Sequence, residues 1–396
     1  MRTYLFLQGP HGSFFRELGL ALQRAGHRVL RVNICGGDVV DWHSREAVWY
    51  QGRTTDWSGW IGDLMRRKGV TDLLAFGDWR PLHREAILVA KLRNIRVWAF
   101  EEGYLRPHYI TMEEGGVNGN SMLPHSPALL RELAEAHPAP PSPVAVQNPL
   151  SARVWKAIAG TIFLRPFFPC FRTHRPQSAV SEVWGWFLRV LTRRTWERRS
   201  AESVREVYRS RVPYFLFPLQ LDSDSQVRRY SPFSGMKEAI AHVLTSFAHS
   251  APKSMHLLIR NHPLDNGLIN YRRYIRRFSH ACGLEGRVHF VESGRAALMM
   301  DRSEGMVVLN STIGISGLQR GIPVYCVGTS IYAVRGLASS QEEQDLDDFW
   351  SNPQKPCPET LRHFEKVLKC RTLINGNFYT EEGVRLAIQG VMERIA

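Results

Sequence analysis

The first 110 or so residues alternate short apolar runs with amphipathic segments. Residues 3–9 read TYLFLQG, which suits a buried strand, and residues 13–26 repeat apolar positions at helical spacing before ending on Gly26. The alternation continues with strand candidates at 27–37, 70–78 and 95–103 and helix candidates at 57–69 and 81–94. Because strands that alternate with helices form parallel sheets, we predict a Rossmann-like domain over residues 1–149, ending in a proline-rich linker.

The second half of the chain shows the same alternation without repeating the sequence. Strand candidates lie at 212–220, 255–260, 287–293, 306–310 and 322–328, with helical patterns between them. We therefore predict a second Rossmann-like domain over residues 213–396. Two such domains facing a cleft constitute a GT-B-like α/β fold. Closing helices near 359–370 and 381–394 either complete the second domain or return to the first.

Residues 150–212 differ in composition from both flanking domains, since they are rich in Arg, Trp and Phe and poor in acids. Trp184, Phe187, Leu188 and Leu191 recur at helical spacing beside several arginines, among them Arg189. A basic amphipathic helix with bulky aromatics suits an anionic lipid surface. A helix packed on its own domain explains the pattern equally well. The region is predicted to be a helical insertion with a possible membrane contact.

Charge and cysteine usage narrow the function classes. The 396 residues include 51 Lys and Arg against 37 Asp and Glu, which favours anionic partners such as nucleic acid, lipid or a sugar nucleotide. No helix-turn-helix, zinc-finger or RNP-like motif accompanies the charge, which disfavours nucleic acid. The six cysteines form no C-x-x-C pair, so neither disulfides nor a metal site is predicted, and a cytoplasmic location fits best. No uncharged stretch approaches 18 apolar residues, so no membrane-spanning helix is predicted.

Two predicted strand ends in the second domain carry candidate anion-binding residues. His262 and Pro263 follow the apolar run MHLLIR, at the edge of the sheet where open α/β folds bind ligands. Another strand ends at Asn310, and Ser311 and Thr312 then precede a predicted helix, whose exposed N–H groups suit a nucleotide phosphate. Each feature alone also fits an ordinary loop or a capped helix. Together they favour a phosphate site.

Residues 217–233 place carboxylates and amides after a third strand of this domain. Asp222 and Asp224 match the D-x-D pattern of a metal site, but the surrounding domain lacks the organisation of the glycosyltransferases that use it. We interpret the segment as a loop that presents a carboxylate together with Gln220 and Gln226. Such a carboxylate can stabilise an oxocarbenium-like transition state or attack an anomeric carbon.

The first domain carries a second carboxylate pair, Glu101 and Glu102, at the end of a predicted strand. A carboxylate here can take the proton of an acceptor hydroxyl, although a solvated pair at a turn has the same spacing. Other polar residues that follow strands of this domain are candidate acceptor contacts: His11, Asp78, Arg80, His83 and Arg106.

Seven segments, in order along most of the chain, resemble the KpsS (LipB) family of retaining β-Kdo transferases of bacterial capsule assembly. The segments are FLQGPHGSFF, FGDWRPLH, FEEGYLRPHYIT, PLQLDSDSQV, IRNHPLDNG, LNSTIGISGL and IYAVRGLA. The resemblance implies transfer of Kdo from CMP-Kdo to a phosphatidylglycerol-type lipid, which starts the poly-Kdo linker of a capsule. It also implies no metal and a peripheral position on the cytoplasmic face of the inner membrane, alongside other capsule enzymes.

The resemblance also implies roles for individual residues. His262 with Pro263, and Ser311 with Thr312, would hold the CMP phosphate, beside Asn310, Gln220 and Gln226. Asp224 maps to the nucleophile and Glu101 to the acid/base, with Asp222 and Glu102 as the alternatives. Retention of configuration then follows from two displacements through a carboxylate adduct.

Two other functions remain open on the sequence. One is a GT-B transferase that uses another sugar nucleotide or extends a Kdo chain. The other is a non-catalytic basic scaffold that binds lipid or another polyanion. Sugar-nucleotide binding separates both transferases from the scaffold.

Overall fold

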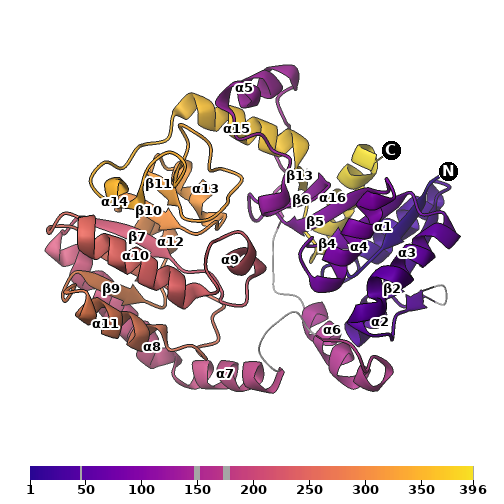
Figure 1. Cartoon of the computed structure of the whole chain (residues 1–396), viewed down its shortest axis with the longest axis horizontal. Coiled ribbons are helices and arrows are strands. Elements are labelled where there is room, and N and C mark those ends of the chain that lie inside the picture. The colour runs from indigo at the N-terminus through magenta and orange to yellow at the C-terminus, as the bar shows by residue number, and fades with distance from the viewer. Residues whose placement is uncertain (45–46, 147–151, 173–178, 396) are drawn as a thin grey trace. The chain divides into compact units, whose positions relative to one another are not determined.

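The computed structural model describes residues 1–44, 47–146, 152–172 and 179–395, and the chain divides into two compact units (Figure 1). The first unit comprises Met1–Leu123, His137–His174 and Lys366–Ala396, and the second comprises Pro124–Ala136 and Arg175–Glu365. This division differs from the predicted one, because residues 150–212 are shared between the units and the C-terminal helix belongs to the first. The predicted boundary at 149/150 lies outside the described residues.

One sheet forms the centre of the first unit, and its described strands run in the order β13-β6-β5-β4-β1-β2-β3. Strands β1 to β5 pair in parallel, whereas β6 pairs antiparallel with both β5 and β13. The strands are β1 Thr3–Phe6, β2 Arg28–Asn33, β3 Val48–Trp49, β4 Asp72–Phe76, β5 Arg96–Glu102, β6 Tyr109–Glu114 and β13 Leu373–Asn375. The helices are α1 Phe14–Arg24, α2 Gly36–Asp41, α3 Trp57–Lys68, α4 Pro81–Leu92, α6 Ala152–Phe163 and α16 Glu381–Ile395, with 3-10 turns η1 Thr54–Asp56, η2 Asn118–Asn120 and η3 Arg165–Phe167.

Alternate residues of β1, together with Leu7 just after it, show how the two faces of this sheet are covered. Tyr4 and Phe6 pack in a core with apolar residues of α1 and α16, while Leu5 and Leu7 pack in a second core with α3 and α4. Side chains alternate between the faces of a strand, and burial on both faces explains its continuous apolar sequence. The closing helix α16 returns to this unit because its apolar side covers the face that α1 leaves partly open.

The second unit contains a parallel sheet whose described strands run in the order β12-β11-β10-β7-β8-β9. The strands are β7 Tyr214–Pro218, β8 His256–Arg260, β9 Val288–Val291, β10 Gly305–Val308, β11 Val324–Cys326 and β12 Ser339–Ser340. The helices are α5 Pro127–Ala136, α7 Ala179–Leu191, α8 Arg193–Ser210, α9 Ser225–Arg229, α10 Met236–Ser250, α11 Tyr271–Ala281, α12 Ala296–Met300, α13 Ile313–Leu318 and α14 Leu346–Phe349. Helix α15, Pro358–Arg371, spans residues of both units. The predicted fold class, α/β with two Rossmann-like domains, is confirmed.

Each sheet has a switch in strand order that positions candidate site residues. In the first sheet the chain moves outward from β1 to β2 and β3 and then returns to the other side of β1 at β4. In the second, β7 is flanked in the same way by β8 and β10. Because loops diverge at such a switch, the carboxyl ends of the two central strands form a ligand-binding crevice in this class of fold. The residues after β1 and β4, and after β7 and β10, are therefore the candidates.

Candidate functional site

Two amide side chains join the loops at the switch of the second unit. Gln220 follows β7 and Asn310 follows β10. The Gln220 Nε2 donates to Asn310 Oδ1 at 3.0 Å, and the Asn310 backbone N–H donates to Gln220 Oε1 at 3.3 Å. Asn310 Nδ2 also donates to the carbonyl oxygens of Gln226 and Tyr230. Gln220 and Asn310 thus position these loops, and their predicted donor contacts remain predictions.

The two aspartates of the β7 loop have different surroundings. Asp222 accepts from the Met236 backbone N–H at 2.9 Å and pairs with Arg228 at 3.2 Å, so each carboxylate oxygen is held by the protein at the start of α10. Asp224 is the N-cap of α9, where its Oδ1 accepts from the Gln226 backbone N–H at 2.9 Å. Asp222 therefore has a clear anchoring role, and the prediction of Asp224 as the nucleophile remains a prediction.

His262 begins a tightly bonded loop after β8. Its Nδ1 accepts from the Leu264 backbone N–H at 3.1 Å, so a neutral His262 carries its proton on Nε2. The buried Asn261 accepts from the His262 backbone N–H at 2.9 Å, and the buried Asp265 accepts from Gly267, whose φ is +75°. The loop thus fixes the imidazole as an Nε2–H donor, which suits a phosphate oxygen.

Ser311 and Thr312 lie where β10 leads into α13. The Ser311 carbonyl oxygen accepts from the buried Tyr332 hydroxyl, and Ser311 Oγ accepts from the Ile313 backbone N–H at 3.4 Å. Thr312 makes no side-chain cap bond. Helix α13 has only six residues and is shorter than the helix that the sequence predicted. A Cβ at Gly314 would collide with Tyr332, which explains the glycine. Sequence reasoning assigned no role to Tyr332, although it belongs to the quoted segment IYAVRGLA.

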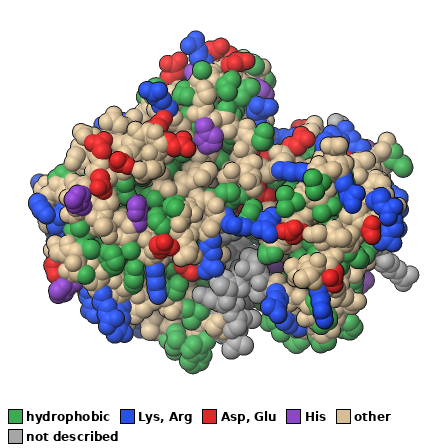
Figure 2. All heavy atoms as spheres, viewed as in Figure 1, with side chains coloured by type: hydrophobic (Ala, Val, Ile, Leu, Met, Phe, Trp, Pro, Cys, Tyr) green, Lys and Arg blue, Asp and Glu red, His purple; other side chains and the backbone are tan. Residues whose placement is uncertain are grey.

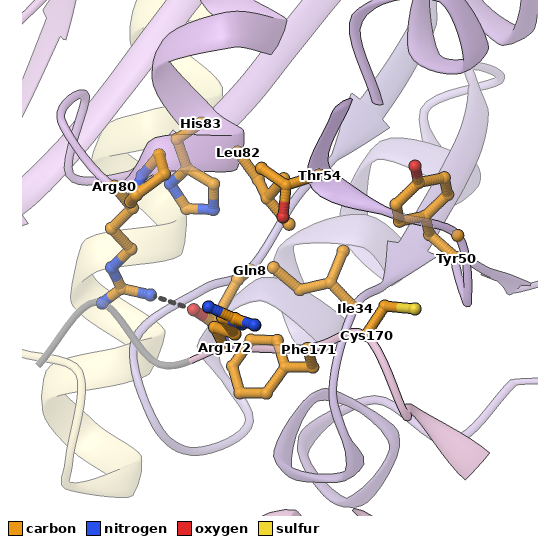
Figure 3. Close-up of a pocket in the computed structure, with 12 residues that line it drawn as sticks. Gln8, Ile34, Tyr50, Thr54, Arg80, Leu82, His83, Cys170, Phe171 and Arg172 are labelled. Atoms are coloured by element: carbon orange, nitrogen blue, oxygen red, sulfur yellow. Dashed lines mark hydrogen bonds between the residues drawn. The ribbon is translucent and has the colours of Figure 1, made fainter. Parts of the chain in front are cut away.

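In the first unit, Gln8 and Arg80 join the loops at the β1/β4 switch. Arg80 Nη1 donates to Gln8 Oε1 at 2.6 Å (Figure 3). The guanidinium carbon of Arg80 lies 5.2 Å from the Phe76 ring centroid. Gln8 and Arg80 line a cavity of about 240 Å³, together with the buried His83. His83 Nδ1 lies 2.9 Å from the Gly77 carbonyl oxygen, to which it donates. Of the predicted acceptor contacts, Arg80 and His83 therefore share one cavity.

The carboxylates at the end of β5 are held differently from each other. Glu102 Oε1 accepts from the Tyr379 hydroxyl, and burial together with this neighbouring carboxylate raises the pKa of Tyr379. Glu101 Oε1 accepts from the Glu102 backbone N–H at 3.0 Å. Its Oε2 lies 3.6 Å from the point that a Cβ on Gly77 would occupy, and thus beside the β4 loop. Glu101 thus lies closer to the loop of Arg80, which favours it over Glu102 as the acid/base. Tyr379 is a contact that sequence reasoning missed.

The other predicted acceptor contacts of the first unit do not line this cavity. Asp78 is buried and accepts from the Val117 backbone N–H and from Asn120 Nδ2, and burial raises its pKa. His11 Nδ1 lies 3.4 Å from Asp41, and Arg106 is exposed and donates to the Gly103 carbonyl oxygen. The geometry gives Asp78 a structural role in the loop after β6, so a direct acceptor contact is not its evident function.

A buried network behind the β5–β6 hairpin was also missed by sequence reasoning. Glu113 accepts from the Tyr104 hydroxyl at 2.7 Å and from the Ser121 hydroxyl. Burial is the largest influence on Glu113 and raises its pKa from 4.5 to about 7. The network supports the hairpin that carries Glu101. Its only sequence signal is a charged residue at an inward position of β6.

In the described part of residues 150–212, helices α6 and α7 expose apolar side chains. In α7 these are Trp184, Trp186, Phe187, Leu188, Val190 and Leu191. Figure 2 shows hydrophobic side chains on the surface in the area where Figure 1 places α7. Arg189 is instead buried against Glu292, to which it donates at 2.7 Å. It therefore anchors α7 and, in contrast to the lipid-facing alternative, is not available for lipid.

Neither a metal cluster nor a membrane-spanning helix is found in the described part of the chain. None of its groups of three or more His, Cys, Asp or Glu could hold a metal ion. Its helices are not long and apolar enough to cross a membrane.

Comparison with known proteins identifies the family. A family model described as capsule polysaccharide biosynthesis protein matches residues 71–379. The chain is 33% identical over 390 residues to the capsule polysaccharide export protein KpsS of Escherichia coli, covering 96% of this chain and 97% of that protein. It is 32% identical over 388 residues to the capsule polysaccharide modification protein LipB of Neisseria meningitidis serogroup B, covering 95% and 91%. The solved structure of Thermosulfurimonas dismutans KpsC, beta Kdo 2,7 transferase, aligns over 100% of both chains with a TM-score of 0.45 at 14% identity. The chain is therefore a member of the capsule polysaccharide biosynthesis protein family.

Proposed function

We propose that this protein is a retaining β-Kdo transferase that moves Kdo from CMP-Kdo to a phosphatidylglycerol-type lipid and so starts the linker of a capsule polysaccharide. The observation that carries the proposal is the grouping of Asp224, His262 and Ser311 on loops at the carboxyl edge of the second sheet, in a chain that the family model matches over residues 71–379. That edge is where this class of fold binds nucleotides.

The second unit suits the donor half of the reaction. CMP-Kdo carries a phosphate and a sugar carboxylate, and an Nε2–H of His262 can donate to the phosphate as negative charge develops on the departing CMP. The backbone N–H groups and hydroxyls at Ser311 and Thr312 add further donors. No metal is needed for this stabilisation, and none is part of the proposal.

Asp224 and Glu101 would carry the two displacements. A carboxylate oxygen of Asp224 attacks the anomeric carbon, the bond from that carbon to the phosphate oxygen breaks, and CMP leaves with the electron pair. Glu101 then takes the proton of the acceptor hydroxyl. At the same time the oxygen of that hydroxyl attacks the anomeric carbon, and the bond from this carbon to Asp224 breaks. Two inversions give net retention and restore both carboxylates once Glu101 releases its proton.

The protein would act as a peripheral protein at the cytoplasmic face of the inner membrane, near other capsule enzymes. The support is the exposed aromatic surface of α7 in a chain with formal net charge +14. Tryptophan and phenylalanine beside arginines suit the interface of an anionic bilayer. The acceptor lipid lies in that surface.

Donor identity can be tested directly by thermal unfolding with a panel of CMP- and UDP-sugars. A ligand that binds only the folded state raises the melting temperature, so CMP-Kdo should give the largest shift. A larger shift with a UDP-sugar would favour a transferase with another donor. The absence of a shift with every sugar nucleotide would favour a non-catalytic scaffold.

A further inference from the structure

The cavity of the first unit has an unusual combination of charge and apolar surface. Arg80 and Arg172 contribute two guanidinium groups, and none of its twelve described lining residues is acidic. Ile34, Tyr50 and Phe171 contribute apolar walls (Figure 3). A cavity with paired cations and apolar walls suits a small anion attached to a hydrocarbon group.

The position of the cavity in the fold favours a bound ligand. Gln8 and Arg80 lie on opposite sides of the β1/β4 switch, where ligands bind in this class of fold. Arg80 is held in place by Gln8, whose Nε2 in turn donates to the Cys35 sulfur at 3.3 Å. The guanidinium is thus oriented before any ligand arrives, which lowers the entropic cost of binding.

One segment that lines the cavity is preceded in the chain by an exposed apolar surface. Residues Cys170, Phe171 and Arg172 line the cavity and come shortly after α6 and η3. In α6 and η3, Phe163 is 79% exposed and Phe167 is 54% exposed, beside the exposed Arg165. Ile158 and Ile162 extend this surface along α6. We call the surface formed by Ile158, Ile162, Phe163 and Phe167 the α6 ridge.

The α6 ridge is a fixed part of the first unit. The Gly37 backbone N–H donates to Thr161 Oγ1 at 3.1 Å, and a Cβ on Gly36 would collide with the Gly160 carbonyl oxygen, so α2 and α6 pack closely. Below η3, Trp49 stacks on the buried Phe168 with ring centroids 5.2 Å apart. The cavity and the ridge therefore keep their relation within this unit.

We infer that this cavity binds the phosphodiester head group of a lipid between Arg80 and Arg172, with the acyl part lying along the α6 ridge. The inference rests on the proposed function, because it identifies where the acceptor of that reaction binds. Arg172 and the ridge are not among the family motifs, and they make the first unit a lipid-binding surface in its own right. Glu101, the proposed acid/base, lies at the carboxyl edge of the same sheet, at the end of β5 and beside the β4 loop that carries Arg80.

Calorimetry with dihexanoylphosphatidylglycerol, below the concentration at which it forms micelles, tests the head-group site on the full chain. Arg172→Gln should weaken binding roughly tenfold, since one charge-assisted contact is lost. Arg24→Gln is the matched control, because it removes the same charge from an exposed position at the end of α1, outside both the cavity and the α6 ridge, and should leave the affinity unchanged. Equal affinity in wild type and Arg172→Gln, or an equal loss in both variants, would overturn the inference.

Ligand controls distinguish a lipid from a free anion. Dihexanoylphosphatidylcholine should bind more weakly, because its head group is zwitterionic, and glycerol 3-phosphate should bind more weakly because it lacks acyl chains. If glycerol 3-phosphate binds as tightly as the lipid, the cavity is a site for a soluble phosphate and the acyl assignment is wrong. Phe163→Ser with Phe167→Ser should weaken binding of the acyl-bearing ligand but leave glycerol 3-phosphate unchanged.

The same variants separate this inference from the proposed function. Arg172→Gln should leave the melting-temperature shift with CMP-Kdo intact, since the donor residues belong to the second unit. Kdo transfer by a protein whose lipid affinity does not depend on Arg172 would overturn the inference alone. Head-group binding that depends on Arg172, in a protein without transferase activity, would overturn the proposed function alone.

Discussion

At the scale of single residues, the hydrogen bond to His262 Nδ1 determines what the imidazole can offer a ligand. Because Nδ1 accepts from the Leu264 N–H, Nε2 carries the proton of the neutral ring. His262→Ala should weaken CMP binding roughly tenfold, as expected for loss of one hydrogen bond to a charged group, without lowering the melting temperature appreciably. Calorimetry with CMP measures the effect, and His280→Ala, at an exposed histidine of α11, is the control. Unchanged affinity in His262→Ala would exclude it from the donor site.

Asp222 and Asp224 should respond differently to substitution. Asp224→Asn should abolish transfer while CMP still binds, because the nucleophile is lost and the phosphate contacts remain. Asp222→Ala should retain transfer but lose about 1 kcal/mol of stability, because the first turn of α10 and Arg228 lose their acceptor. Turnover and urea unfolding of both variants provide the comparison. An active Asp224→Asn together with an inactive, folded Asp222→Ala would show that the roles are reversed.

Glu113 should make stability depend on pH. Its folded-state pKa is raised to about 7, so the folded protein binds this proton more tightly than the unfolded chain. The stabilisation is therefore complete below pH 4.5 and is lost as the pH rises through 7, by about 1.4 kcal/mol per unit of pKa shift.

Urea unfolding at pH 5 and pH 8 can isolate this contribution. Glu113→Gln should lose less stability than wild type between the two values, whereas Glu114→Gln, at the exposed neighbouring residue, should behave as wild type. The same pH dependence in all three proteins would rule out Glu113 as its source.

At the scale of elements, α7 is the clearest candidate for a membrane contact. Trp184 is 57% exposed and Phe187 is 51% exposed, and their rings stack with centroids 5.5 Å apart. Replacing both with Ser should weaken binding to phosphatidylglycerol vesicles at least tenfold, because two large apolar groups no longer enter the interface.

Co-sedimentation with vesicles is the measurement, and Leu88→Ser with Leu92→Ser removes exposed apolar groups from α4 as a control. Binding should also fall with added salt, because arginines attract the anionic surface. If both double variants bind as wild type, α7 is not the contact.

The elements were predictable from the sequence where their pattern was local. The apolar runs at β1, β7 and β8 are buried on both faces and have no competing interpretation. The position of α7 was not predictable in the same way, because an amphipathic helix has the same spacing whether its aromatic side faces protein or solvent. Likewise, the burial of Arg189 depends on Glu292, which is distant in sequence.

At the scale of the whole molecule, the sequence predicted two Rossmann-like units but not their composition. Helix α16 has an apolar side that could cover either sheet, and its packing against α1, β6 and β13 assigns it to the first unit. Residues of the candidate site also differ in whether local sequence pattern could predict them. Strand-end residues such as His262 were predictable from local pattern, whereas Tyr379 and Arg172 reach their sites through contacts between distant segments.

The central claim is transfer of Kdo from CMP-Kdo to a phosphatidylglycerol lipid, and the product mass tests it most directly. Purified protein is incubated with CMP-Kdo and a fluorescent phosphatidylglycerol, and the lipid is then analysed by mass spectrometry, with Asp224→Asn as the inactive control. We expect the wild-type protein to add the mass of one Kdo residue to the lipid and the variant to add none. An unmodified lipid with the active preparation, or the same product from Asp224→Asn, would contradict the account.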